Sequence, residues 1–102
     1  MGINNRDTDR FAFSSVAWVK LFKKINQEQD FKMYELVDIS QSGISFRAVH
    51  ANEFKRGDEF FILEIGDKIL KKALHSKVIY VQEVETDTAT FIKIGSEFIE
   101  KL

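Results

Sequence analysis

The stretch YELVDISQSGISFRAV, residues 34–49, decides the fold of this chain. Two apolar runs, residues 34–37 and 44–49, flank the polar hexapeptide DISQSG at residues 38–43. Asp and Ser side chains accept hydrogen bonds from backbone N–H groups one or two residues further on, and a glycine adopts the positive φ that closes such turns. The stretch therefore predicts two strands joined by a turn, with Gly43 at positive φ.

Alternation along the first of these strands puts Asp38 and Ser40 on the parity of Tyr34 and Leu36. If the alternation continues to the turn, both polar side chains point to one side of the sheet. Beyond the turn, the apolar set shares one face, opposite Ser45, and comprises Ile44, Phe46 and Ala48.

The rest of the chain also carries the period-two pattern of strands, with turn residues between them. Besides the strand that begins at Ile44, the pattern predicts strands over residues 13–25, 31–39, 59–65, 69–84 and 89–99. No segment has the pattern of a long amphipathic helix. Six antiparallel strands with regularly spaced turns favour a small closed barrel, since closure removes exposed sheet edges.

Two local features are expected within these strands. Gly66 and Asp67 form a two-residue hairpin of type II′, because the glycine stands at the first central position. The long strand after it is expected to bulge near residues 71–72. Its alternation otherwise puts Tyr80 on the parity of Leu74 and Val78.

A second polar motif, RDTDR at residues 6–10, precedes the first strand. Arg6 and Arg10 offer two planar guanidinium forks that suit phosphate or the N7/O6 edge of guanine. The alternative is a solvated arm in which Asp7 and Asp9 are the local partners of the arginines, since the five residues carry no net charge. Residues 1–12 are therefore expected to be a flexible arm, and residues 13–102 the barrel.

The two motifs together, R-x-x-x-R and D-x-S-x-x-G, resemble the PilZ domain, the bacterial receptor module for cyclic di-GMP. The resemblance covers nearly the whole chain and includes KRGDE at residues 55–59 and G-x-x-F at residues 95–98. It implies an all-β, six-stranded antiparallel barrel, usually followed by a C-terminal helix. The sequence stops at Leu102, so at most a very short helix is expected.

The resemblance also implies which residues contact the nucleotide. Arg6 and Arg10 would bind its phosphates, while Asp38 would accept hydrogen bonds from guanine N1–H and N2–H. The remaining contacts implied are Ser40 at the guanine edge, Gly43, which gives room for the ligand, and Gly95. A glycine within a strand can instead mark a bulge or a close approach of another backbone. In PilZ domains, a basic residue just before R-x-x-x-R tends to accompany a stacked nucleotide dimer. Asn5 occupies that place here, which favours one bound nucleotide.

Composition bounds the class of protein. The 102 residues suit one domain, and 15 Lys+Arg against 16 Asp+Glu give a net charge of −1. That balance argues against a nucleic acid polymer as partner. The chain has no cysteine, no apolar run long enough to span a membrane and no signal pattern, so a cytoplasmic location is expected.

Neither catalysis nor a metal is expected. His50 and His75 stand alone, and no P-loop, dinucleotide fingerprint or nucleophile elbow is present. The sequence thus predicts a receptor that binds cyclic di-GMP, needs no cofactor and acts on an unidentified downstream protein. Two alternatives stay open: a degenerate PilZ barrel that serves as a nucleotide-independent adaptor, and a barrel that binds single-stranded nucleic acid through Trp18 and Phe22.

Overall fold

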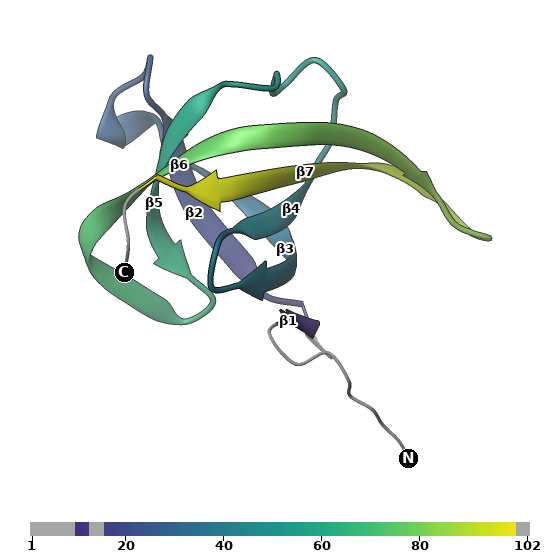
Figure 1. Ribbon diagram of the computed structural model, residues 1–102, viewed down its shortest axis with the longest axis horizontal. Helices are drawn as coiled ribbons and strands as arrows, with labels where there is room; N and C mark the ends of the chain where they lie inside the picture. The colour runs from purple at the N-terminus through teal and green to yellow at the C-terminus, as the bar shows by residue number, and fades with distance from the viewer. Residues whose placement is uncertain (1–9, 13–15, 100–102) are drawn as a thin grey trace.

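The computed structural model describes residues 10–12 and 16–99, with the backbone alone for residues 10–12. Its elements are β1 (Arg10–Ala12), β2 (Trp18–Lys23), the 3-10 turn η1 (Glu28–Asp30), β3 (Lys32–Ser40), β4 (Ile44–Ala48), β5 (Glu59–Ile65), β6 (Lys68–Glu85) and β7 (Thr90–Phe98). β6 and β7 form a long hairpin that extends beyond the rest of the sheet (Figure 1).

Six of the described strands close into a barrel. The hydrogen-bonded order is β3–β2–β5–β6–β7–β4, and β4 pairs again with β3, so the ring is complete and antiparallel throughout. β1 lies outside this ring and pairs with the last three residues of β3. The predicted six-stranded antiparallel barrel is confirmed. Closure leaves each strand of the ring with two partners, which protects its edges.

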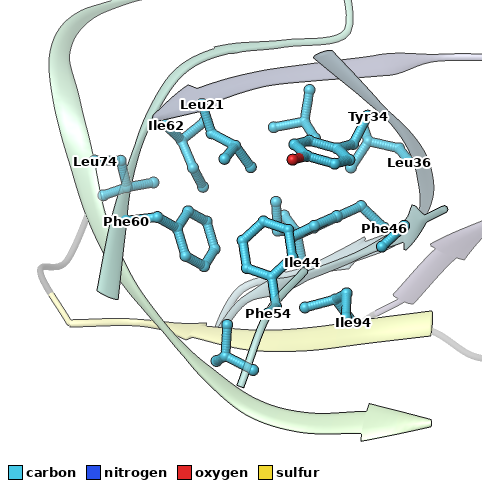
Figure 2. Packing of buried hydrophobic residues seen from close by; sticks show 13 residues of the cluster. Leu21, Tyr34, Leu36, Ile44, Phe46, Phe54, Phe60, Ile62, Leu74 and Ile94 are labelled. Carbon is cyan, nitrogen blue, oxygen red and sulfur yellow. The ribbon is translucent and has the colours of Figure 1, made fainter. Parts of the chain in front are cut away.

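The inward side chains of every strand of the ring form one core. Ring contacts join Phe46 to Tyr34, Phe54 and Phe60, with centroids 5.1–5.7 Å apart. Phe54 comes from the loop between β4 and β5, and its ring packs with this cluster (Figure 2). The other buried apolar residues are Val19, Leu21, Leu36, Ile44, Ala48, Ile62, Leu74, Val78 and Ile94.

A single-residue bulge interrupts β3 just before the turn. Leu36 lies opposite Phe46 on β4, and Asp38 lies opposite Ser45, so Val37 is an extra residue. Ser45 follows core residue Ile44 and precedes core residue Phe46, which places Ser45 and its partner Asp38 on the outer face. The expectation that Asp38 shares the side of Leu36 is therefore wrong, because the bulge reverses the alternation.

A second bulge has the same effect in β6. Val78 lies opposite Ser96 and Tyr80 lies opposite Gly95, so Ile79 is the extra residue. Val78 points into the core, whereas Tyr80 lies on the outer face beside Gly95. The expected shared parity of Val78 and Tyr80 is also wrong, for the same physical reason.

The hairpin between β5 and β6 agrees with its sequence. Ile65 pairs with Lys68, which leaves two residues in the turn, and Gly66 has φ +64° while Asp67 has no positive φ. These values fit the predicted type II′ turn. The irregular register that follows, where residues 70–73 lie opposite a single residue of β5, confirms the predicted bulge near residues 71–72.

Two buried serines generate a prediction about stability. Ser76 is fully buried and its hydroxyl has no hydrogen-bond partner in the described part of the chain, whereas the buried Ser96 hydroxyl donates to the Ile44 carbonyl at 2.9 Å. An unsatisfied buried hydroxyl destabilises a fold. We expect Ser76→Ala to raise the free energy of unfolding by about 1 kcal/mol, a rise of about 4–8 °C in melting temperature.

Ser96→Ala is the matched control, because the same atoms are removed from a satisfied position. It should lower the free energy of unfolding by about 1 kcal/mol. Thermal denaturation followed by circular dichroism measures both changes. Equal destabilisation by the two substitutions would contradict this account of Ser76.

Candidate ligand-binding site

A recess of about 110 Å³ lies on the outer face of the barrel, where β3, β4, β6 and β7 run side by side. Four predicted site residues line it together: Asp38, Ser40, Gly43 and Gly95. The other lining residues are Ser42, Ile44, Ser45, Ile79, Tyr80, Ser96 and Glu97. The D-x-S-x-x-G motif therefore lies beside β7, a strand that is about fifty residues away in the sequence.

The predicted arginines relate to this recess in different ways. β1 brings the backbone of Arg10 opposite Ser40 at the end of β3, next to the turn. Arg6 lies outside the described residues. The structure therefore joins the end of the R-x-x-x-R motif to the D-x-S-x-x-G strand through backbone pairing.

The Asp38 carboxylate is held in place by β4. The Ser45 hydroxyl donates a hydrogen bond of 2.7 Å to Asp38 Oδ1. Lys93 Nζ lies 4.0 Å from Asp38 Oδ2, a loose contact from the β7 side. The hydrogen bond from Ser45 therefore fixes the orientation of the Asp38 carboxylate.

The turn after Asp38 is braced by hydrogen bonds at both ends. The Ser40 N–H donates to the Gly43 carbonyl at 2.9 Å, and the Ser42 N–H donates to Ser40 Oγ at 3.3 Å. On the other side, the Phe98 N–H donates to the Ser42 carbonyl at 2.7 Å. The turn is therefore fixed to the last residue of β7, and the Ser40 hydroxyl takes part in the turn itself.

Gly43 is required here for space and not for its backbone conformation. A Cβ at this position would lie 1.8 Å from the Ser96 carbonyl oxygen and 2.8 Å from the Glu97 Cα. Its φ is not positive, since Gly57 and Gly66 are the glycines with positive φ among the described residues. The expectation of a positive φ at Gly43 is wrong, because the turn closes by contact with the β7 backbone.

Gly95 also makes room, but for a side chain. A Cβ built on Gly95 would lie 2.0 Å from Tyr80 Cε2 and 2.2 Å from Tyr80 Cζ. The glycine therefore lets the Tyr80 ring rest against the backbone of β7. The sequence alternative was a close approach of another backbone; here the approaching group is a side chain.

Two neighbours of the motifs were not among the sequence-predicted residues. Lys93 shares the outer face with Gly95, two residues further on, so alternation alone was a usable signal for it. Tyr80 carried no such signal, because the bulge at Ile79 moves it from the expected inner face to the outer one.

Among the described residues, the two groups with a shifted pKa, Glu59 and Tyr34, lie away from this recess. Hydrogen bonds from His75, at 2.6 Å, and from Lys24, at 3.2 Å, lower the pKa of Glu59. Burial, followed by the hydrogen bond to Glu53, raises the pKa of Tyr34. Both groups therefore belong to the architecture of β2, β3 and β5 and not to the candidate site.

A larger recess of about 680 Å³ opens on another part of the barrel, around the end of β4. Trp18 and Met33, which are 45% and 50% exposed, contribute apolar surface to it. Arg47 Cζ lies over the Phe91 ring, 4.0 Å from its centroid. Arg47 Nε lies 3.9 Å from Glu35 Oε1. This recess holds the exposed tryptophan that the sequence suggested for nucleic acid, whereas Phe22 instead stacks on Phe61.

Solved structures resemble this chain throughout its length. K. pneumonia MrkH in complex with c-di-GMP has a TM-score of 0.64 at 14% identity, over 94% of this chain and 44% of MrkH. The PilZ domain of YcgR from Escherichia coli, with c-di-GMP, has a TM-score of 0.62 at 12% identity, over 95% of this chain and 79% of the YcgR chain. The Bacillus subtilis inhibitor of motility, MotI, has a TM-score of 0.58 at 16% identity, over 98% of this chain and 45% of MotI.

These likenesses define the fold as a PilZ-like barrel. The chain spans less than half the length of MrkH and of MotI. No family model and no curated protein matches the sequence. Within the described residues, no helix is long and apolar enough to cross a membrane.

The contact between the turn and β7 generates a prediction. Gly43→Ala forces a methyl group against the Ser96 carbonyl, which is backbone and cannot rotate away. We expect it to lower the free energy of unfolding by about 1–3 kcal/mol. Urea denaturation measures this change.

Gly66→Ala is the control for backbone conformation. No atom lies within 4 Å of its added Cβ, but φ is +64°, so the cost should be about 1–2 kcal/mol from strain alone. The two variants differ in a second observable: Gly43→Ala should shift the amide NMR resonances of Ser96 and Glu97, and Gly66→Ala should not. Unchanged Ser96 and Glu97 resonances in Gly43→Ala would contradict the described contact.

Proposed function

We propose that this chain is a receptor for cyclic di-GMP that binds the nucleotide on the outer face between β3, β4, β6 and β7. The observation that carries the proposal is the convergence of Asp38, Ser40, Gly43 and Gly95 on one recess, with the Arg10 backbone paired beside it. The complexes of MrkH and of the YcgR PilZ domain with c-di-GMP support the proposal, since their barrels have the same fold.

The chemistry of the ligand suits these residues. Cyclic di-GMP carries two phosphodiester charges and two guanines, so a receptor needs cationic forks and an acceptor for the guanine edge. Arg6 and Arg10 supply the forks, the oriented Asp38 carboxylate accepts from guanine N1–H and N2–H, and the Ser40 hydroxyl lies at the guanine edge.

Magnitudes show that few contacts are enough. Each charge-assisted hydrogen bond contributes about 1.5–3 kcal/mol. A micromolar dissociation constant corresponds to about 8 kcal/mol. Two arginine contacts and one guanine contact therefore supply most of the required affinity. Asp7 and Asp9 reduce the local positive charge, so the arginines must exchange these partners for phosphate when the ligand binds.

The signal in this proposal is the ordering, against the barrel, of the residues that precede β1, since residues 10–12 already pair with β3. Ile3 is the only apolar residue beyond Met1 in residues 1–10, so the segment cannot offset an ordering entropy of about 1–2 kcal/mol per residue by itself. Phosphate contacts supply that free energy when the nucleotide is present. The altered surface then acts on a downstream protein, and the domain carries out no chemistry of its own.

A nucleotide-independent adaptor is the second candidate, and the larger recess favours it. Trp18, Met33 and Val49 are exposed there, at 45%, 50% and 79%, and apolar surface of this kind suits contact with another protein. The adaptor role requires that the fold be kept while cyclic di-GMP fails to bind.

Direct titration separates the two candidates. We expect calorimetry to show specific binding of cyclic di-GMP.

We expect Arg10→Ala to weaken this binding about 30- to 150-fold, since a charged contact of about 2–3 kcal/mol is lost. Asp38→Ala should weaken binding too, and should also lower the stability of the free protein by up to about 1 kcal/mol, because Ser45 loses its acceptor.

Lys68→Ala is the control for general charge, since Lys68 lies at the β5–β6 hairpin and does not line the recess. It should leave the affinity unchanged. Binding of wild-type strength in both Arg10→Ala and Asp38→Ala would place the ligand elsewhere. No heat and no melting shift at millimolar nucleotide would favour the adaptor.

Hydrogen exchange tests the arm mechanism separately from binding. Protection should rise across residues 5–10 and residues 38–43 together when cyclic di-GMP is added, because one ligand bridges both segments. Protection that rises at residues 38–43 alone would keep the binding site but exclude the ordering of the arm as the signal.

A further inference from the structure

Tyr80 lines the candidate site, yet neither motif includes it. Of the described residues around the 110 Å³ recess, Tyr80 alone carries an aromatic ring. A guanine offers a flat π-face that aromatic side chains bind by stacking. The position of Tyr80 therefore bears on how a guanine is held there.

The bulge at Ile79 is the reason that Tyr80 reaches this face. Without the extra residue, alternation from Val78, which is 1% exposed, would direct Tyr80 into the core. Ile79 itself is left 38% exposed, so the bulge does not improve apolar burial at its own position. Bulges next to binding sites commonly redirect a side chain, and here two of them, at Val37 and Ile79, direct Asp38 and Tyr80 to one face.

Strand register places Tyr80 and Asp38 in one row. Asp38 lies opposite Ser45, Ser45 opposite Gly95, and Gly95 opposite Tyr80. Adjacent strands are about 4.8 Å apart, so the outermost Cα atoms of the row are separated by about 14 Å. The Tyr80 ring leans over Gly95, one strand nearer to Asp38, which leaves a gap that a purine can span.

Lys93 borders the same gap. Its Nζ lies 4.0 Å from Asp38 Oδ2 and 5.9 Å from the centroid of the Tyr80 ring. Lys93 therefore places a cation over the Tyr80 ring and near the Asp38 carboxylate, at the edge of this gap. Such an edge suits the polar rim of a stacked base.

We propose that Tyr80 is the stacking platform for the guanine whose Watson–Crick edge is bound by Asp38. Gly95 is then a positioning residue, which acts by seating the Tyr80 ring and does not itself contact the ligand. This inference rests on the proposed binding of cyclic di-GMP and assigns one further contact within that site.

Substitution of Tyr80 separates stacking from packing. Tyr80→Leu keeps an apolar side chain over Gly95 but removes the π-face, and should weaken cyclic di-GMP binding about 5- to 150-fold. Tyr80→Phe keeps the ring and should change the affinity by about twofold or less. Phe91→Leu is the matched control, because Phe91 is an aromatic residue of β7 that lines the other recess, and it should bind like wild type.

A double-mutant cycle tests the role given to Gly95. Gly95→Ala should weaken binding in the wild-type background, because the added Cβ displaces the Tyr80 ring. In a Tyr80→Ala background there is no ring to displace, so Gly95→Ala should have no further effect. An undiminished effect in that background would make Gly95 a direct ligand contact and overturn its positioning role.

Proton NMR of the nucleotide gives a readout that a merely structural role would not move. Guanine H8 should shift upfield on binding to wild type and to Tyr80→Phe, since the tyrosine ring current acts on a stacked base. If wild type binds without that shift, or if Tyr80→Leu binds with full affinity, Tyr80 is not the stacking platform. Either result leaves the receptor function intact. Failure of wild type to bind cyclic di-GMP removes both. If Tyr80→Leu does not fold, the H8 shift in wild type decides alone.

Discussion

The bulge at Val37 is the constraint on which the candidate site depends. β3 must present Leu36 to the core and Asp38 to the outer face within two residues, and strict alternation cannot do both. The extra residue resolves the conflict just before the turn, where Ser45 then fixes the carboxylate. Gly43 completes the arrangement by letting the turn lie directly against the backbone of β7.

The sequence was a good guide to elements and a poor guide to faces. Period-two patterns located the six barrel strands, and Gly66 specified its own hairpin, because these signals are local. The two bulges are not local, since each depends on the register with a neighbouring strand. For that reason the grouping of Asp38, Ser40, Gly43 and Gly95 in one recess could be expected from their motifs, while the outward position of Tyr80 could not.

The architecture connects the candidate site with the rest of the barrel surface. β3, β4 and β7 contribute residues both to the small recess and to the larger one beside Trp18. In the proposed receptor, a ligand that bridges Asp38 and β1 would contact one end of these strands, and their other end carries the exposed apolar surface.

Amide NMR shift mapping with cyclic di-GMP tests the central claim most directly, because the two recesses are lined by different backbone segments. The account predicts that perturbed amides cluster at residues 38–45, 79–80 and 93–97, around Asp38 and Tyr80. Perturbations centred on Trp18, Met33 and Val49, with residues 38–45 unchanged, would contradict it and assign the nucleotide to the larger recess.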